Sequence, residues 1–480
     1  MPSRNSLSAT SLIASSHRFP TLLTGLLFMS ALLCPAQQIK VLYNFGGPDP
    51  GGLPIYVTLT QGRDGALYGT SSQDSGNVFR LTTQGQYSQL YAFSSGPFIN
   101  PEGGVTLGAD GNFYGTTQLG GVSYNFGGLF QLTPAGVFTD LYEFNDFFVD
   151  SYPAAPPILA SDGNFYGTTV GVGTDGEQDG AVVYRYMPSD GSTTILYTSY
   201  PATGAFLWGP VQGTDGNLYA TAQYGGPKQW GNIFEMSLAG DFIFDHGLTG
   251  PPGPAAPFSG LIQGSDGNFY GTSSEGGTSG RQGHGEAGFG TVYKMDTSNT
   301  VTALYSFPSE AGGYFPVGAL TEGTDGYLYG TTSEGGPDDG GTLFRISTSG
   351  SYERLGSFTY ETGIQPLGAL MQHTNGVFYG TTRSYGANGP GTVYSLDMGL
   401  APFVAFVQPT GEVGATAQIL GQGFNHVTAV SFNGVPATTF AATSDTYLIA
   451  TVPSGATTGP VTVTTSTGTL TSNKSFQVLP

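Results

Sequence analysis

The chain has 480 residues, of which only 10% are charged, and its 33 acidic and 13 basic side chains give a formal net charge of −20 at pH 7. Binding to nucleic-acid phosphates needs clustered Lys and Arg, so this balance argues against a nucleic-acid partner. The one cysteine, Cys34, excludes a disulfide within the chain. The 78 glycines favour tight turns and close backbone packing.

The first 36 residues have the pattern of a secretory signal peptide. They include two arginines, no acid and a short apolar run from Leu22 to Leu33. This run is too short to span a bilayer, and the small residues that follow it predict cleavage after Ala36. A lipoprotein anchor at Cys34 is the alternative, although Leu33 stands where a small residue is preferred. We expect a secreted or cell-surface protein without a transmembrane segment in the mature chain.

A unit of about fifty residues, typified by residues 323–350, recurs along most of the chain. Each copy contains four short β-rich pieces separated by Gly-rich turns, which is what one blade of a β-propeller requires. The copies are marked by a two-residue turn at Asp64, Asp110, Asp162, Asp215, Asp266 and Asp325, and by a divergent seventh turn at Asn375.

The two ends of the repeat array are out of phase. A strand of the fourth type, residues 41–45, precedes the first turn, and the last copy stops after its third strand, residues 391–396. Pairing between these two segments would close a ring without leaving a free sheet edge. The sequence therefore predicts an all-β fold, with a seven-bladed β-propeller over residues 37–397.

The composition changes after the repeats. Residues 398–401 form a short linker, and residues 402–480 are rich in Thr, Val and Ala. Alternating strands such as 430–432 and 461–464, with an Asn433-Gly434 hairpin turn, predict a small β-sandwich.

Two resemblances follow from these motifs. Residues 402–480 resemble an IPT/TIG domain, which has an immunoglobulin-like fold, in the series Gly421-Gln422-Gly423-Phe424, residues 430–434 and Val452-Pro453. The repeat, Asp-Gly-x-Leu/Phe-Tyr-Gly-Thr-Thr with later Gly-Gly and Gly-Thr-Val-Phe segments, resembles the tandem repeat of bacterial choice-of-anchor GloVer-containing proteins over about residues 41–397. These resemblances imply export, with a spacer or adhesive role for the C-terminal domain. They assign no biochemical activity.

Aromatic residues are frequent in the long connections, which we expect on one face of the ring, opposite the Asp-Gly turns. Flat rings beside polar groups suit a sugar-binding groove, because apolar sugar faces stack on them. The alternative is that the rings fill gaps between blades. The candidate ligand-binding residues are Trp208, Trp230, Tyr224, Phe206, Tyr124 and Phe148.

One acidic loop has part of a Ca²⁺-binding pattern. Asp175, Glu177 and Asp179 stand at positions 1, 3 and 5, with Gly180 at position 6, but Tyr186 replaces the acid needed at position 12. A metal-free surface loop is the alternative interpretation. The seven matched turns, six of them Asp-Gly, also offer a ring of carboxylates, although Asp-Gly is common in hairpins for its tolerance of positive φ. We expect no cofactor other than this candidate Ca²⁺.

Catalytic motifs are absent from the sequence. It contains no Gly-x-Ser-x-Gly elbow and no pair of histidines with metal-ligand spacing. The leading hypothesis is therefore an exported, non-catalytic protein whose propeller recognises a glycan or a cell-surface polymer, with the IPT/TIG domain as a spacer or adhesive module. A scaffold for protein–protein contacts in the cell envelope is the alternative. A polysaccharide-cleaving enzyme is the third possibility.

Overall fold

A computed structural model describes residues 39–47, 52–95, 97–122, 125–145, 152–153, 155–170, 181–199, 205–279 and 288–480, without the side chains of residues 95, 205 and 206. The chain divides into two units, Met1–Ala36 and Gln37–Pro480, and all described residues belong to the second. The segment interpreted as a signal peptide lies outside the described residues, so its cleavage stays a prediction.

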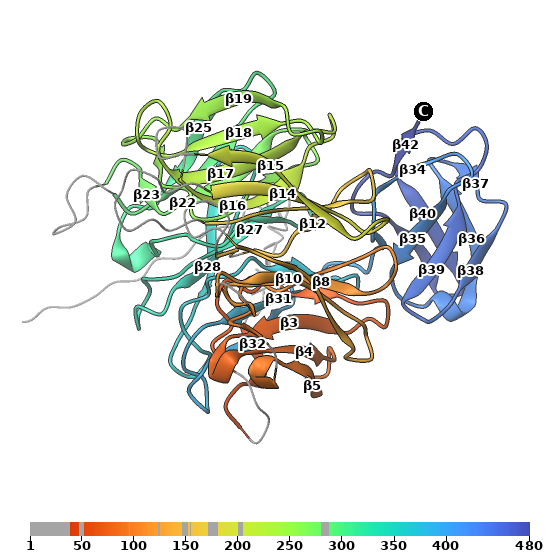
Figure 1. Ribbon diagram of the computed structural model, residues 1–480, viewed down its shortest axis with the longest axis horizontal. Coiled ribbons are helices and arrows are strands. Elements are labelled where there is room, and N and C mark those ends of the chain that lie inside the picture. The colour runs from red at the N-terminus through yellow and green to blue at the C-terminus, as the bar shows by residue number, and fades with distance from the viewer. Residues whose placement is uncertain are drawn as a thin grey trace, which may run out of the picture. The chain divides into compact units, whose positions relative to one another are not determined.

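The described part of the chain is built from β-strands (Figure 1). It contains nine four-stranded sheets, of which seven lie between residues 40 and 396. These seven are named sheets 1 to 7, in the order of their turns from Asp64 to Asn375. In each of them, four strands follow one another from a first strand to a fourth, and neighbouring strands are antiparallel. The repeated unit of the sequence thus corresponds to one sheet.

The strands of sheets 1 to 7 match the four pieces of each repeat. The first strands are β2 (Thr60–Gln61), β7 (Val105–Leu107), β12 (Ile158–Leu159), β16 (Ala205–Gln212), β21 (Ile262–Gln263), β26 (Thr321–Glu322) and β30 (Met371–Gln372). The second strands are β3 (Leu67–Ser71), β8 (Phe113–Thr117), β13 (Phe165–Thr168), β17 (Leu218–Tyr224), β22 (Phe269–Ser273), β27 (Leu328–Thr332) and β31 (Phe378–Thr382).

The outer half of each sheet follows the same order. The third strands are β4 (Asn77–Leu81), β10 (Gly128–Leu132), β14 (Ala181–Met187), β18 (Asn232–Met236), β24 (Thr291–Met295), β28 (Thr342–Ile346) and β32 (Thr392–Leu396). The fourth strands are β5 (Tyr87–Ala92), β11 (Phe138–Glu143), β15 (Ser192–Ser199), β19 (Phe242–Gly247), β25 (Val301–Ser306), β29 (Tyr352–Ser357) and, for sheet 7, β1 (Lys40–Asn44).

Several connections carry short elements of their own. Two small ladders pair β6 (Phe98–Ile99) with β9 (Leu119–Gly120), and β20 (Pro254–Ala255) with β23 (Glu275–Gly276). Single 3-10 turns are η1 (Gln73–Ser75), η2 (Phe93–Ser95) and η3 (Glu310–Gly312).

Sheet 7 joins the two ends of the repeat array. Strand β1 pairs antiparallel with β32, with Lys40 opposite Ser395 and Asn44 opposite Thr392. The Phe45 amide extends the pairing by donating to the Gly391 carbonyl at 3.1 Å. This confirms the predicted pairing of residues 41–45 beside residues 391–396, and it leaves β32 with a neighbour on each side.

The turn aspartates accept hydrogen bonds from groups within their own turns and second strands. In sheet 5, Asp266 Oδ1 accepts the Asn268 amide at 3.1 Å, and Oδ2 accepts the Tyr270 hydroxyl at 2.6 Å. The same pair of bonds forms in the other sheets with a turn aspartate. Burial, followed by the nearby carboxylate, raises the pKa of Tyr270. These carboxylates therefore stabilise turns, which favours the structural interpretation of the Asp-Gly motif.

The Tyr-Gly-Thr part of the repeat packs one sheet and binds it to the next. A Cβ on Gly330 would lie 2.6 Å from Cζ of Phe344, so the ring on the third strand requires glycine there. The Thr272 hydroxyl donates to the Gly318 carbonyl of the following sheet at 3.0 Å. The Thr381 hydroxyl likewise reaches the Val57 carbonyl at 3.2 Å, linking sheet 7 to sheet 1.

Aromatic packing fills the space between neighbouring sheets. The motif tyrosine of one sheet lies against the phenylalanine that precedes the motif tyrosine of the next. The ring centroids of Tyr114 and Phe165 are 4.0 Å apart, and those of Tyr329 and Phe378 are 4.2 Å apart. All four side chains are buried, so the hydrophobic core is divided among the junctions between sheets.

Residues 402–480 form the other two four-stranded sheets. One contains β33 (Ala405–Phe406), β35 (Thr416–Leu420), β39 (Tyr447–Thr451) and β38 (Phe440–Ala442), and the other contains β37 (Val435–Pro436), β36 (Val427–Phe432), β40 (Val461–Thr465) and β41 (Gly468–Thr471). Strands β34 (Thr410–Glu412) and β42 (Gln477–Leu479) pair in parallel, and η4 (Phe424–His426) precedes β36. A separate buried cluster that includes Phe424, Phe432, Leu448 and Phe476 forms their core.

This C-terminal segment contacts the turns of sheets 1, 2, 3 and 7. The Thr446 hydroxyl donates to the Arg63 carbonyl at 2.7 Å, and the Arg63 guanidinium lies 4.5 Å from the centre of the Tyr447 ring. Side-chain amides bind the other three turns: Gln418 to the Ala109 carbonyl at 2.8 Å, Gln408 to the Ala160 carbonyl at 2.9 Å and Gln422 to the Thr374 hydroxyl at 2.9 Å. The turn side of the repeat domain is thus partly covered by residues 402–480.

Candidate functional site

The aromatic residues singled out from the sequence do not all share one environment. Trp208 lies within β16 rather than in a connection, because this first strand is longer than the others, and its side chain is 7% exposed. Tyr224 ends β17 with 48% exposure, and Trp230 lies in the connection to β18 with 36% exposure. Phe206 is in β16, but its side chain is not described. Tyr124 and Phe148 lie outside the described residues.

The acidic loop proposed for Ca²⁺, with Asp175, Glu177 and Asp179, also lies outside the described residues, so this prediction stays untested. Within the part of the chain that the structure describes, no three His, Cys, Asp or Glu side chains come together as a potential metal site.

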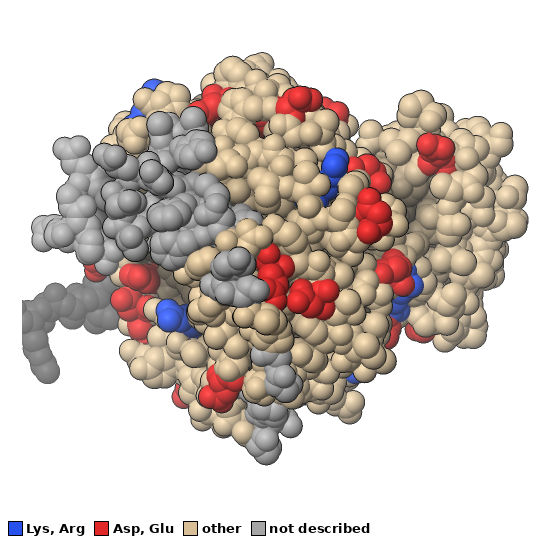
Figure 2. All heavy atoms as spheres, viewed as in Figure 1, with Lys and Arg blue, Asp and Glu red and all other residues tan. Residues whose placement is uncertain are grey.

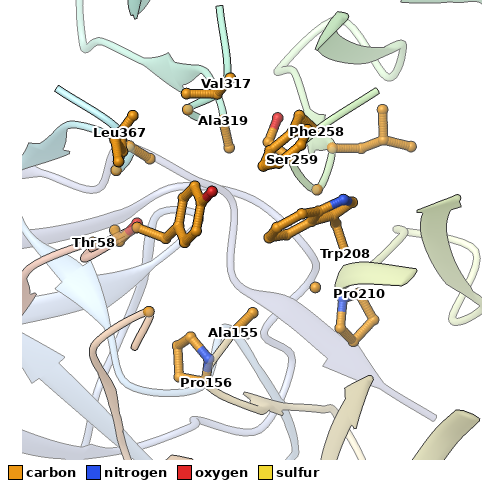
Figure 3. A pocket seen from close by; sticks show the side chains of 18 of the residues that line it. Thr58, Ala155, Pro156, Trp208, Pro210, Phe258, Ser259, Val317, Ala319 and Leu367 are labelled. Atoms are coloured by element: carbon orange, nitrogen blue, oxygen red, sulfur yellow. The ribbon is translucent and has the colours of Figure 1, made fainter. Parts of the chain in front are cut away.

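A cavity of about 250 Å³ lies where the first strands of all seven sheets converge (Figure 3). Much of its wall comes from one repeat position, eight residues before the turn residue. In sheets 1, 5, 6 and 7 this position is Tyr56, Phe258, Val317 and Leu367. Since each first strand runs from this position towards its turn, the cavity lies away from the turns and from residues 402–480. The first strands are therefore innermost, which gives the repeat domain a propeller-like architecture.

Three aromatic rings form one wall of the cavity. Trp208 packs against Phe258 with ring centroids 4.6 Å apart, and Figure 3 shows these two side chains beside each other, across from Leu367 and Thr58. Tyr56 is 5.4 Å from Trp208 and 5.8 Å from Phe258, again between ring centroids. Among the described residues, the buried indole N–H of Trp208 has no hydrogen-bond acceptor. Small residues such as Ala155 and Ala319 complete the lining, so the rings border open space.

Charge beside the cavity comes from Glu102 and Arg383. Glu102 directly precedes the lining residue Gly103 and is only 6% exposed. Burial raises its pKa to about 7, although the positive charge of Arg383 opposes this shift. The pKa of Tyr56 is raised by burial and then by the negative charge of Glu102. One wall of the cavity is thus next to a carboxyl group that titrates near neutral pH.

Exposed aromatic residues in two connections lie close in the chain to the cavity. The Ala256 amide donates to the Trp230 carbonyl at 2.9 Å, which places this connection against the segment that leads to Phe258. In sheet 7, Tyr360 and Tyr385 are about half exposed, with ring centroids 4.7 Å apart. None of these exposed rings is part of the cavity lining itself.

Several members of this site were missed by the sequence analysis, namely Tyr56, Phe258, Glu102, Arg383, Tyr360 and Tyr385. The pattern that the repeats share predicts strands and turns, whereas the cavity residues stand at positions where the repeats differ. A signal for the cavity residues was present, because the position eight residues before each turn residue varies between aromatic, aliphatic and acidic side chains. Other connection aromatics, such as Phe98 and Tyr314, are buried, as the gap-filling alternative predicted.

A profile of the Gloeobacter/Verrucomicrobia repeat matches the chain over residues 24–171, 152–285 and 207–442. These overlapping matches cover most of the sequence. The chain belongs to the Gloeobacter/Verrucomicrobia repeat family. This confirms the resemblance of the repeat to GloVer-containing proteins. No curated protein matches the chain.

Solved structures resemble this Gloeobacter/Verrucomicrobia repeat protein at low sequence identity. An oligogalacturonate lyase in complex with manganese aligns at 13% identity over 75% of this chain and 93% of its own, with a TM-score of 0.50. PorZ, a surface component of the type-IX secretion system of Porphyromonas gingivalis, aligns at 14% identity over 91% and 61%, with a TM-score of 0.46. A putative 6-phosphogluconolactonase from Bacteroides uniformis aligns at 16% identity over 66% and 88%, with a TM-score of 0.45. The first likeness supports the fold alone.

The helices in the described ranges are 3-10 turns, and none has the length to cross a membrane.

Proposed function

We propose that this protein is an exported, non-catalytic binding protein that recognises a glycan or a cell-surface polymer through its central cavity. In this proposal sheets 1 to 7 are the blades of a seven-bladed β-propeller. Residues 402–480 are an immunoglobulin-like IPT/TIG domain that acts as a spacer or adhesive module. Cleavage of a signal peptide near Ala36 releases the chain from the secretion machinery.

The observation that carries the proposal is the aromatic wall of the cavity. Trp208 and Phe258 present ring surface beside open space, and sugar rings stack on such surfaces through their apolar faces. The cavity volume of about 250 Å³ is just below the range of about 300–1,000 Å³ for ligand pockets, which suits one terminal sugar residue. In this proposal the exposed Trp230 and Tyr224 contact the next residues of a longer chain.

The charge of the protein argues against a polyanion such as a nucleic acid. On the face that Figure 2 shows, acidic side chains are scattered, basic side chains are few and most of the surface is uncharged. Hydrogen bonding to sugar hydroxyls needs polar groups beside the rings, and Glu102, the Tyr56 hydroxyl and the Trp208 N–H are candidates for this role.

The test is a glycan and bacterial cell-wall polymer array with the full chain, followed by calorimetric titration of each polymer that binds. We expect saturable binding that falls at least tenfold in Trp208→Ala, because the largest stacking surface is lost. Phe242→Ala removes an exposed aromatic ring on the outer strand β19 and serves as the matched control, with unchanged affinity.

Because Trp208 is buried, its replacement can also affect folding. Ala319→Leu fills the cavity without removing a packed ring, so it should abolish binding while the thermal unfolding midpoint stays near that of the wild type. Saturable binding that survives both Trp208→Ala and Ala319→Leu would refute the cavity as the site. A blank array would favour the envelope scaffold, and soluble sugar fragments released with time would establish an enzyme.

A further inference from the structure

Glu102 stands at a repeat position that lines the cavity in other sheets. In sheets 1, 5, 6 and 7, the residue eight positions before the turn residue lines the cavity with an aromatic or aliphatic side chain. In sheet 2 the same position is Glu102, and the next residue, Gly103, lines the cavity. An acid at a position that otherwise carries apolar side chains needs a physical reason beyond packing.

Glu102 is only 6% exposed, and burial is the main cause that raises the pKa of its carboxyl group. Arg383 is near enough to oppose the upward shift of its pKa, yet the two side chains form no ion pair. Burying a carboxylate is costly, so an opposite charge supplied by a ligand would stabilise the ionised form of Glu102.

The neighbouring rings favour the same kind of charge. The Gly103 amide donates to the Ile55 carbonyl at 3.2 Å, which brings the segment of Glu102 beside that of Tyr56. The Tyr56 ring belongs to the cluster with Trp208 and Phe258, whose centroids are 4.6 to 5.8 Å apart. The faces of aromatic rings attract ammonium groups within about 6 Å of the ring centre. A carboxyl group beside a cluster of rings is therefore a suitable environment for a protonated amine.

We propose that the sugar bound in the cavity is an amino sugar with a free amine, whose ammonium group lies between the Glu102 carboxylate and the rings of Tyr56 and Trp208. This inference rests on the proposed function and specifies its ligand class. N-acetylation removes the positive charge, and a hydroxyl in place of the amine never carries one. The cavity therefore discriminates against both.

Arg383 carries the opposite charge to the Glu102 carboxylate, so its replacement should have the opposite effect on amine binding. Its guanidinium is exposed, and its positive charge acts on both Glu102 and Tyr56. An ammonium group near Glu102 is repelled by this charge. Arg383→Gln is therefore expected to tighten amine binding, whereas Glu102→Gln is expected to weaken it.

The experiment compares three β-1,4-linked oligosaccharides of equal length, made of glucosamine, N-acetylglucosamine or glucose, by calorimetric titration of the full chain at pH 7. We expect the wild type to bind the glucosamine oligomer at least tenfold more tightly than the other two. Glu102→Gln should reduce this preference to less than twofold. Arg383→Gln should increase affinity for the glucosamine oligomer two- to fivefold.

The outcomes separate this inference from the proposed function. Equal affinity for the three oligomers, or preference that persists in Glu102→Gln, overturns the amino-sugar assignment and leaves glycan binding intact. Absence of binding to any of the three, together with a blank polymer array, overturns both. Binding of a lysine oligomer that depends on Glu102, without binding of the glucosamine oligomer, shows that the amine belongs to a peptide and overturns the assignment to a sugar.

Discussion

The two ends of the first strands differ in how the repeat is used. At the turn end, the same Asp and Tyr pair recurs in sheet after sheet, and its polar atoms bind each other, as Asp266 and Tyr270 do at 2.6 Å. At the cavity end, the corresponding residues differ from sheet to sheet, from Tyr56 to Glu102 to Leu367. Here the buried Trp208 N–H lacks an acceptor among the described residues. Residues that recur from repeat to repeat stabilise the sheets. Residues that differ between repeats line the cavity, where they could contact a ligand.

The largest expected effect is a loss of stability at the cavity end of the first strands, where backbone segments of neighbouring sheets pack closely. A Cβ on Gly368 would overlap the Val57 carbonyl oxygen, where the first strands of sheets 7 and 1 approach each other. Backbone atoms cannot move aside as flexible side chains do. Gly368→Ala should therefore destabilise the fold by about 3 kcal/mol, measured by denaturant unfolding.

Gly312→Ala is the control for this substitution, since the nearest atom to its added Cβ is 3.6 Å away. It should change the free energy of unfolding by about 0.5 kcal/mol or less. Equal stability of Gly368→Ala and wild type would contradict the close approach of the two strands.

A smaller effect is expected for ligand affinity at the cavity, which should depend on pH. The pKa of Glu102 is about 7, raised by burial, so the carboxylate that attracts an amine is lost as pH falls below this value. Burial keeps the Tyr56 hydroxyl neutral by raising its pKa, so the carboxyl group of Glu102 is the protein group beside the rings whose charge changes in this pH range. Affinity for the glucosamine oligomer should be about tenfold weaker at pH 5.5 than at pH 7.

Calorimetric titrations at both pH values measure this change, and Glu102→Gln provides the reference. The variant lacks the carboxyl group, so its affinity should not fall between pH 7 and pH 5.5. An equal pH dependence in the variant and the wild type would place the titrating group elsewhere.

The smallest expected effect is that of replacing a turn aspartate by asparagine, the residue that sheet 7 already has at this position. In sheet 7, Asn375 replaces the turn aspartate and donates to the Tyr379 hydroxyl at 3.1 Å. Asp266→Asn should therefore keep the turn and cost about 1 kcal/mol or less, as expected for one altered hydrogen bond. Thermal unfolding measures the loss, and ligand affinity should not change. A loss as large as that of Gly368→Ala would show that the carboxylate does more than stabilise its turn.

Most of the repeat architecture was predictable from the sequence. Asp-Gly turns, a period of about fifty residues and short β-rich pieces are local signals, and each specifies a turn or a strand without reference to distant residues. The offset between residues 41–45 and residues 391–396 also predicted the pairing of the chain ends, which the ladder between β1 and β32 confirms.

The candidate site was predicted less well. Trp208 and the exposed Trp230 were grouped because both occur in the same repeat, but the first is buried among Tyr56 and Phe258. Residues that belong to three repeats meet in this cluster. Such contacts depend on how the sheets converge, which the spacing of residues within one repeat does not reveal.

The sequence by itself determined the strands, the turns and the way in which one repeat follows another, because each depends on hydrogen bonds and packing within about fifty residues. Only the tertiary structure decided which side chains share the central cavity. It brings Glu102 next to Tyr56 and Tyr56 next to Trp208, residues that are far apart along the chain. The physical reason is that the seven first strands, which are remote in sequence, all begin around the same small cavity.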